Sequence, residues 1–147
     1  MNKHFILLTA LLGTLSGSVG AQRPARTVDE LYAEGKQLYL RQHYAAAQQT
    51  LEDYLQQPMA AEADRARAIE AESMTVCAAN YLKSADRFDR ILNYLVKYPD
   101  TPHANRLHAL AGNVLYADGM YERALDCYGR AALEKLGNDD RDEATLY

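Results

Sequence analysis

The chain contains few β-branched residues, a class that favours β-strands. Ala, Leu, Gln, Glu and Arg are instead abundant among its 147 positions. This balance favours helices over strands. The hydrophobic share of 48% and the charged share of 24% are ordinary for a chain that buries a core, and they argue against disorder. At this length we expect one domain or part of an extended repeat array.

The first residues lack the length of a membrane span. The apolar run from Phe5 to Leu15 covers 11 residues, and a bilayer-spanning helix needs about 20. Lys3 and His4 precede this run as a short basic start, and small residues follow it up to Ala21. This three-part layout is typical of a secretory signal peptide that is cleaved after Ala21. We therefore expect an exported chain with no integral membrane span.

The sequence also lacks an excess of basic residues. Removal of residues 1–21 as a signal peptide leaves 22–27 as a linker, and only Lys3 is lost from the charged set. The mature chain then has 15 basic and 20 acidic residues, a net charge of −5. Acidic and basic residues are interspersed, so no basic face is visible that would bind nucleic acid. We expect no nucleic-acid partner.

Cysteine is scarce as well, and its two positions leave two interpretations open. Cys77 and Cys127 both lie within amphipathic helical patterns, where a small apolar thiol commonly packs in a core. A disulfide between them is the alternative in an exported protein, because the sequence does not report their separation. No second Cys or His stands near either one at ligand spacing, so we expect no metal site.

Apolar residues recur with helical periodicity after the linker. Thr27 and Glu30 have the spacing of a capping box that begins a helix. The positions Leu31, Gly35 and Leu38 fall on one face of that helix, and a break follows near residues 42 and 43. A second apolar stripe then runs from Tyr44 to Leu55 and is closed by Pro58. Two such helices joined by a few residues predict an antiparallel hairpin over 28–58.

The same hairpin pattern recurs near the end of the chain. Five positions match at a single offset of 77 residues: Gly35 and Gly112, Leu38 and Leu115, Tyr39 and Tyr116, Tyr44 and Tyr121, and Ala47 and Ala124. Thr101 and Pro102 provide a helix start, since proline is tolerated at the first helical position. These matches predict a hairpin over 102–136 and an internal repeat.

The offset leaves room for one further hairpin between these two. Residues 60–99 supply it with a less regular pattern, in which Ile69, Val76 and Tyr81 mark a first helix and Phe88 and Ile91 a second. The whole pattern therefore predicts an all-α fold of about three hairpins. Beyond Gly137, residues 138–147 have the composition of the start of a further helix, so we expect a truncated array.

The outer hairpins resemble the tetratricopeptide (TPR) family. GKQLYLRQHYAAA at 35–47 and GNVLYADGMYERA at 112–124 carry glycine, a large apolar residue, tyrosine and alanine at the family's spacing. The resemblance implies an α-solenoid that forms a right-handed superhelix. Glycine and alanine would permit close helix approach, and Tyr44 and Tyr121 would wedge between adjacent hairpins. The middle hairpin departs from the pattern, because Ser73 is its nearest counterpart to the glycine.

The same resemblance implies a concave groove lined by the first helix of each hairpin. Its predicted binding residues are Tyr32, Lys36, Tyr39, Arg106, Asn113 and Tyr116. Aromatic side chains would supply contact area, and polar groups would fix the register of an extended peptide or a partner helix. The alternative is that Tyr39 and Tyr116 simply pack between helices.

No arrangement of residues has catalytic spacing. His103 and His108 are five residues apart, which places them on different sides of a helix as poor joint ligands. The sequence contains no zinc-protease, phosphate-loop or nucleophile-elbow motif. We therefore expect a non-catalytic scaffold or adaptor without cofactor. The junction Tyr98-Pro99-Asp100-Thr101-Pro102, together with the signal-peptide layout, resembles exported bacterial TPR proteins of the cell envelope. This resemblance implies a location in the bacterial periplasm or outer envelope. The alternatives are the sensory ectodomain of a longer membrane receptor and the targeting arm of an envelope enzyme.

Overall fold

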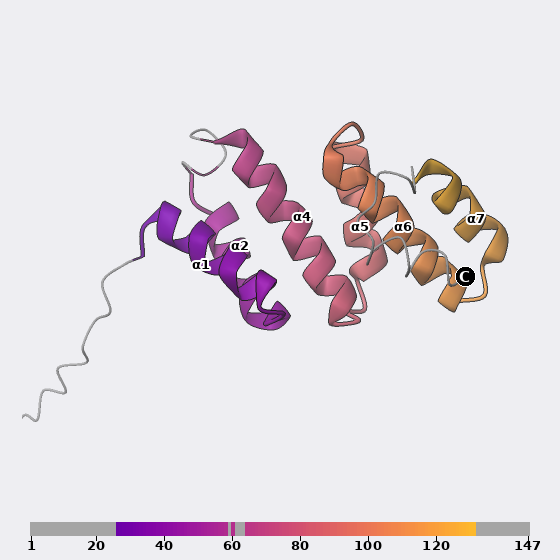
Figure 1. Cartoon of the computed structure of the whole chain (residues 1–147), viewed down its shortest axis with the longest axis horizontal. Coiled ribbons are helices and arrows are strands. Elements are labelled where there is room, and N and C mark those ends of the chain that lie inside the picture. The colour runs from indigo at the N-terminus through magenta and orange to yellow at the C-terminus, as the bar shows by residue number, and fades with distance from the viewer. Residues whose placement is uncertain (1–25, 59, 61–63, 132–147) are drawn as a thin grey trace, which may run out of the picture.

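The computed structural model describes residues 26–58, 60 and 64–131, and this part of the chain is helical without strands (Figure 1). Its helices, with the labels of Figure 1, are α1 (Val28–Leu40), α2 (Tyr44–Leu55), α4 (Arg65–Tyr81), α5 (Arg87–Lys97), α6 (Pro102–Ala117) and α7 (Tyr121–Arg130). The predicted all-α class is confirmed. The expected signal peptide at 1–21, the first four residues of the linker and the expected helix at 138–147 lie outside the described residues.

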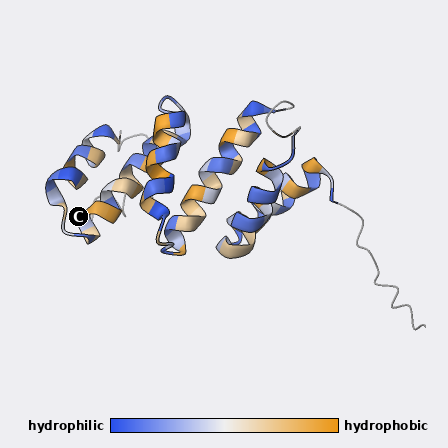
Figure 2. Cartoon of the chain, turned by 180° about the vertical axis from the view of Figure 1, so that it is seen from behind, coloured by the Kyte–Doolittle hydropathy of each residue, from blue (hydrophilic) through white to orange (hydrophobic). Residues whose placement is uncertain are grey.

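The helices form three consecutive pairs along the long axis of the molecule. Figure 1 shows α1 and α2 at one end and α7 at the other. Each helix in this order contacts the next, and α4 also contacts both α1 and α6. Apolar and polar residues alternate along the helices, as the mixed colours in Figure 2 show. In an amphipathic helix such as α5, this pattern buries one side against the neighbouring helices.

Three helices end with the same backbone turn. Gln42, Lys83 and Gly119 have φ values of 62°, 54° and 77° and follow α1, α4 and α6 respectively. The backbone N–H of each donates to the carbonyl three residues earlier, and the following N–H donates to a carbonyl five residues earlier. This is the Schellman arrangement, which requires a left-handed residue. The turns therefore give a common reference point within each pair.

That reference point identifies the counterpart of the repeat glycine in the middle pair. Gly35 and Gly112 each lie seven residues before the left-handed residue, and the same count from Lys83 reaches Val76 rather than Ser73. Val76 is buried in the same apolar cluster as Ile91 of α5. A valine at this position contributes its side chain to the core that α4 shares with α5 and α6, whereas a glycine would contribute none.

The close approach of α1 and α2 depends on Gly35. A Cβ atom at Gly35 would lie 2.6 Å from two carbon atoms of the fully buried Leu51. In the third pair, a Cβ atom at Gly112 would overlap the ring of Tyr128. The neighbouring small residues Ala47 and Ala124 are buried as well. These are the small residues that the repeat pattern placed at helix contacts.

Two predicted helix starts are present. Glu30 donates its backbone N–H to the Thr27 hydroxyl oxygen at 3.2 Å, and the Thr27 backbone N–H donates to the Glu30 carboxylate at 2.8 Å. These two reciprocal hydrogen bonds form a capping box, which satisfies backbone N–H groups that have no partner within the first helical turn. At the start of α6, Pro102 occupies the first turn as expected.

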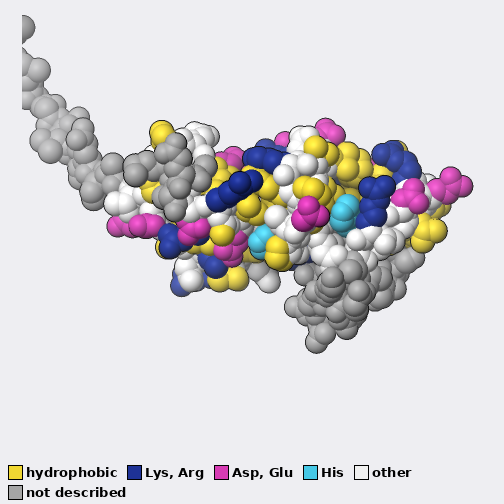
Figure 3. Space-filling model, turned by 90° about the horizontal axis from the view of Figure 1, so that it is seen from above, with side chains coloured by type: hydrophobic (Ala, Val, Ile, Leu, Met, Phe, Trp, Pro, Cys, Tyr) yellow, Lys and Arg dark blue, Asp and Glu magenta, His cyan; other side chains and the backbone are white. Residues whose placement is uncertain are grey.

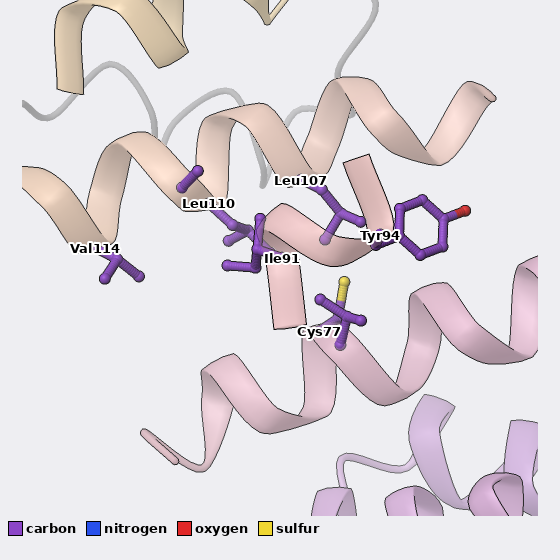
Figure 4. Packing of buried hydrophobic residues seen from close by; sticks show 8 residues of the cluster. Cys77, Ile91, Tyr94, Leu107, Leu110 and Val114 are labelled. Carbon is purple, nitrogen blue, oxygen red and sulfur yellow. The ribbon is translucent and has the colours of Figure 1, made fainter. Parts of the chain in front are cut away.

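Two apolar cores meet at α4. The first joins α4, α5 and α6 and is shown in Figure 4; its buried members are Val76, Cys77, Ile91, Tyr94, Leu107, Leu110, Ala111 and Val114. The second joins α1, α2 and α4 and includes Leu31, Leu51, Tyr54, Ala60, Ala71 and Met74. Because α4 contributes to both cores, its middle is buried on nearly every side.

Both cysteines are free thiols, so the disulfide alternative is not realised. Cys77 is buried in the core between α4, α5 and α6, whereas Cys127 on α7 is half-buried. Burial raises the pKa of the Cys127 thiol. The expectation of two packed thiols therefore holds fully for Cys77 and in part for Cys127.

Candidate binding groove

The first helices of the three pairs line one pocket of about 170 Å³. The residues around it come from α1, α4 and α6 and are Lys36, Tyr39, Leu40, Glu70, Ser73, Met74, Cys77, His103, Arg106 and Leu107. Three of the six predicted groove residues, Lys36, Tyr39 and Arg106, therefore lie together. They are far apart in the sequence, and the contacts of α4 with α1 and α6 bring them to one site.

Sequence reasoning missed the contribution of α4 to this pocket. Glu70, Ser73 and Cys77 were not among the predicted groove residues. They lie as many residues before the left-handed Lys83 as Asp29, Tyr32 and Lys36 lie before the left-handed Gln42. They are therefore the equivalents of these three residues of the first pair. The misplaced register of the middle pair concealed this equivalence, because Ser73 was assigned to the glycine position.

Glu70 connects α4 to α1 at the edge of the pocket. Its carboxylate accepts a hydrogen bond from the Tyr32 hydroxyl at 2.5 Å and another from the Lys36 ammonium at 2.9 Å. Burial by itself would raise the pKa of Glu70, but these two hydrogen bonds outweigh it and hold that pKa below its ordinary value. Glu70 is therefore ionised at neutral pH, and Tyr32 and Lys36 are held in place.

A second, larger hollow of about 440 Å³ shares the lining residue Lys36 with the first. Its other lining residues include Asp29, Tyr32 and Arg67. Arg67 of α4 forms an ion pair with Asp29 of α1 at 2.8 Å, and its guanidinium carbon lies 5.4 Å from the centre of the Tyr32 ring. A cation at this distance from an aromatic face is attracted to it. We call the two hollows together the α1–α4–α6 groove.

Three tyrosines near the pocket connect the first pair of helices to the second pair. Tyr44 of α2 lies edge-on to Tyr39, with ring centres 5.7 Å apart, and is stacked on Tyr81 of α4 at 4.5 Å. Burial raises the pKa of Tyr39 well above its ordinary value, so its hydroxyl stays neutral. Tyr39 therefore both packs between helices and lines the pocket. Tyr44 contacts Tyr39 of the first pair and Tyr81 of the second, so it lies between these two pairs.

Asn113 and Tyr116 are not part of this groove's lining. Asn113 accepts a hydrogen bond from the Tyr128 hydroxyl of α7 at 2.7 Å. Tyr116 lies edge-on to Tyr121, with ring centres 5.1 Å apart, and borders a separate hollow at the α7 end of the molecule. These two predicted groove residues therefore contact α7 instead.

The repeat relation between Tyr44 and Tyr121 yields a matched stability test. Tyr44 is stacked on a neighbouring pair, whereas the equivalent Tyr121 is 62% exposed. We expect Tyr44→Ala to lower the free energy of unfolding by about 1–2 kcal/mol. Tyr121→Ala should lower it by less, about 0.5 kcal/mol, because Tyr121 is mostly exposed and its ring contact is with Tyr116 of its own pair. Urea denaturation of both variants measures the difference, and equal losses would contradict the unequal packing of the two positions.

The described residues hold no cluster suited to a metal ion. No group of three His, Cys, Asp or Glu side chains gathers closely within 26–58, 60 and 64–131. His103 lines the groove, whereas His108 lies in a different hollow near Arg130, where burial lowers its pKa.

None of the helices within residues 26–58, 60 and 64–131 is long and apolar enough to cross a membrane. Figure 3 shows acidic and basic side chains interspersed on the face that it presents.

Comparison with known proteins adds no assignment. No family model, no curated protein and no solved structure matches the chain. The functional argument therefore rests on the chain's own residues and their arrangement.

Proposed function

We propose that the chain is a non-catalytic scaffold or adaptor built as a TPR-like α-solenoid, which binds a protein partner in the α1–α4–α6 groove. The observation that carries this proposal is the pocket lined jointly by the first helices of the three pairs. The repeated turns after α1, α4 and α6 support the solenoid, because one local geometry recurs in successive hairpins. Stacked hairpins of this kind create extended binding surfaces.

The groove suits an extended peptide or a partner helix. Its walls combine the apolar Leu40, Met74 and Leu107 with charged groups such as Lys36 and Arg106. Apolar walls supply contact area, and a few positioned polar groups supply register. The groove walls are helices packed against cores, so the binding surface is formed before a partner arrives. Such preorganisation lowers the entropic cost of binding.

We further propose that the scaffold acts outside the cytoplasm, in the periplasm or at the outer envelope. The support is the signal-peptide layout of residues 1–21, which precede the described part of the chain. Mass spectrometry of the purified chain is expected to find Gln22 at its N-terminus. An intact N-terminus on chain recovered from the cytoplasm alone would contradict the proposed location.

Site-specific photo-cross-linking tests the groove. Leu40 is 64% exposed and borders the pocket, whereas Val96 is 84% exposed on α5. We would replace each in turn with a photoreactive phenylalanine analogue in cells that make the protein. The expected result is a discrete cross-linked partner from position 40, identified by mass spectrometry, and none from position 96. Both positions are well exposed, so the difference reports location rather than accessibility.

The alternatives give different patterns in the same experiment. A partner that cross-links from position 96 alone would contradict binding in the groove and place it on the second helices. Equal labelling of several proteins from both positions would indicate non-specific contact. The absence of cross-links from either position would count against a scaffold.

A further inference from the structure

The outer face of α7 lies at one end of the molecule and forms a second binding surface (Figure 1). We propose that this face docks an amphipathic helix of a partner protein, and that this helix carries lysine or arginine along one edge. The α7 face consists of Tyr121 and Leu125, with Glu122 and Asp126 along its edge. It shares no lining residue with the α1–α4–α6 groove, so this site is additional to the one in the proposed function.

Two large apolar side chains lie exposed on the α7 face. Tyr121 is 62% exposed and Leu125 is 71% exposed. Together with Tyr116, Ala124 and Tyr128 they line a hollow of about 440 Å³. The two exposed side chains are four residues apart on the helix, so they are neighbours on its surface. An exposed apolar surface that is bordered by charged residues is typical of a site for protein binding.

The first pair shows how an equivalent face is covered within this same molecule. Tyr44 and Tyr121 are repeat equivalents, and each lies edge-on to a tyrosine of the preceding helix, Tyr39 and Tyr116 respectively. In the first pair, α4 packs against α2 and places the Tyr81 ring on Tyr44, with ring centres 4.5 Å apart. No residue in the described part of the chain stacks on Tyr121 in this way. The α7 face therefore suits a helix that brings an aromatic or large apolar side chain to Tyr121.

The edge of the α7 face is acidic. Glu122 and Asp126 are exposed and lie four residues apart on one side of the helix. The corresponding side of α2 carries Glu52, whose carboxylate accepts a hydrogen bond from the guanidinium of Arg90 on α5 at 2.8 Å. There the next pair supplies the cation. A helix that covers α7 is favoured when it brings lysine or arginine to this edge, because opposite charges assist docking and like charges oppose it.

Charge also favours a partner helix over two other occupants of the α7 face. The segment that follows α7 in the chain, residues 132–147, contains five acidic and two basic residues, so it brings charge of the same sign as the edge. A second copy that packs its own α7 antiparallel on the first brings the acidic edges of the two copies together, because a twofold axis places equivalent edges side by side. A basic partner helix avoids both repulsions.

Differential selection from a helix library tests the partner chemistry. Amphipathic helices of about 18 residues, long enough to span α7, would be displayed singly on a carrier and selected on the full-length chain. Helices that also bind a Leu125→Asn variant would be discarded, which removes those that bind the groove. We expect the remaining helices to share an aromatic or large apolar residue beside an edge of Lys or Arg. Recovery of acidic or uncharged edges, or of no helix at all, would overturn the inference.

Protein variants locate the contact of the tightest selected helix. Tyr121→Ala should weaken its binding by about tenfold, whereas the control Val96→Ala, at an exposed apolar position of α5, should change binding by less than about twofold. The charge variant Glu122→Gln/Asp126→Asn should weaken it by about threefold to tenfold and reduce its sensitivity to salt. Its control is Asp89→Asn on α5, which is exposed as well. Fluorescence anisotropy with the labelled helix measures all four, and unaltered binding to Tyr121→Ala or to the charge variant would contradict the proposed site.

Photo-cross-linking from position 125 distinguishes the occupants. With the labelled helix present, a photoreactive group at position 125 is expected to cross-link to that helix. A cross-link to residues 132–147 of the same chain, or to a second copy, would show that the face is already occupied and would refute a partner helix. Cross-linking from position 40 tests the groove separately, so failure at α7 leaves the proposed function standing.

Discussion

Tyr94→Ala is expected to lower the free energy of unfolding by about 3–5 kcal/mol, as for other large residues that are truncated in a core. The side chain is only 1% exposed and lies between α4 and α6, as Figure 4 shows. Its ring also contacts the Tyr98 ring, with centres 5.0 Å apart. Truncation removes apolar contacts of three helices at once and leaves a cavity. Urea denaturation followed by far-ultraviolet circular dichroism measures the loss.

Tyr94→Phe is the control for this truncation. The Tyr94 hydroxyl donates to the Ile69 carbonyl at 3.4 Å and lies 3.4 Å from the Thr101 hydroxyl, so both contacts are long for hydrogen bonds. Removing the hydroxyl should therefore cost less than about 1 kcal/mol. A loss as large as that of Tyr94→Ala would show that polar contacts, rather than packing of the ring, hold the middle of the molecule together.

Gly35→Ala and Gly129→Ala are expected to change stability in opposite directions. A Cβ atom at Gly35 would lie 2.6 Å from two side-chain carbons of the fully buried Leu51, so that side chain would have to shift within the core. Overpacking of this kind typically costs about 1–3 kcal/mol. Gly129 lies within α7, and a Cβ atom added there would have no other side chain or distant backbone within 4 Å. Alanine there should add up to about 1 kcal/mol, because it favours the helix more than glycine does.

Thermal and urea denaturation of the two glycine variants separate packing from helix propensity. Both substitutions add the same methyl group within a helix, so their helix-propensity gains are similar. The difference between the two variants therefore reports the space between α1 and α2. If Gly35→Ala were as stable as Gly129→Ala, the close approach of α1 to α2 would not depend on a glycine.

Local features of the fold were predictable because they depend on nearby residues. The capping box of Thr27 and Glu30, the start of α6 at Pro102 and the break after α1 all follow from side chains within a few positions. The apolar stripes also predicted which side of a helix is buried, as at Leu31 and Leu51. Such signals operate over one or two helical turns, and they needed no knowledge of the tertiary structure.

The middle pair was predictable only in outline. Its first helix has Val76 where the outer pairs have glycine, and its second helix begins later after the turn, so the spacing of the repeat is altered. The sequence pattern then aligned Ser73 with the glycine and hid the groove residues on α4, among them Glu70 and Cys77. The correct register follows from the left-handed residue Lys83, and a lysine carries no strong sequence signal for that conformation.

By itself, the sequence determined the helical class, the main helix boundaries and the internal repeat of this protein, because periodicity and capping are local properties. It also placed Tyr32, Lys36, Tyr39 and Arg106 among the residues that line the two hollows. Only the tertiary structure decided that α4 completes the pocket and that Asn113 and Tyr116 contact α7 instead. Those outcomes depend on how side chains from three or more helices share space and charge, which the spacing of residues along one helix does not specify.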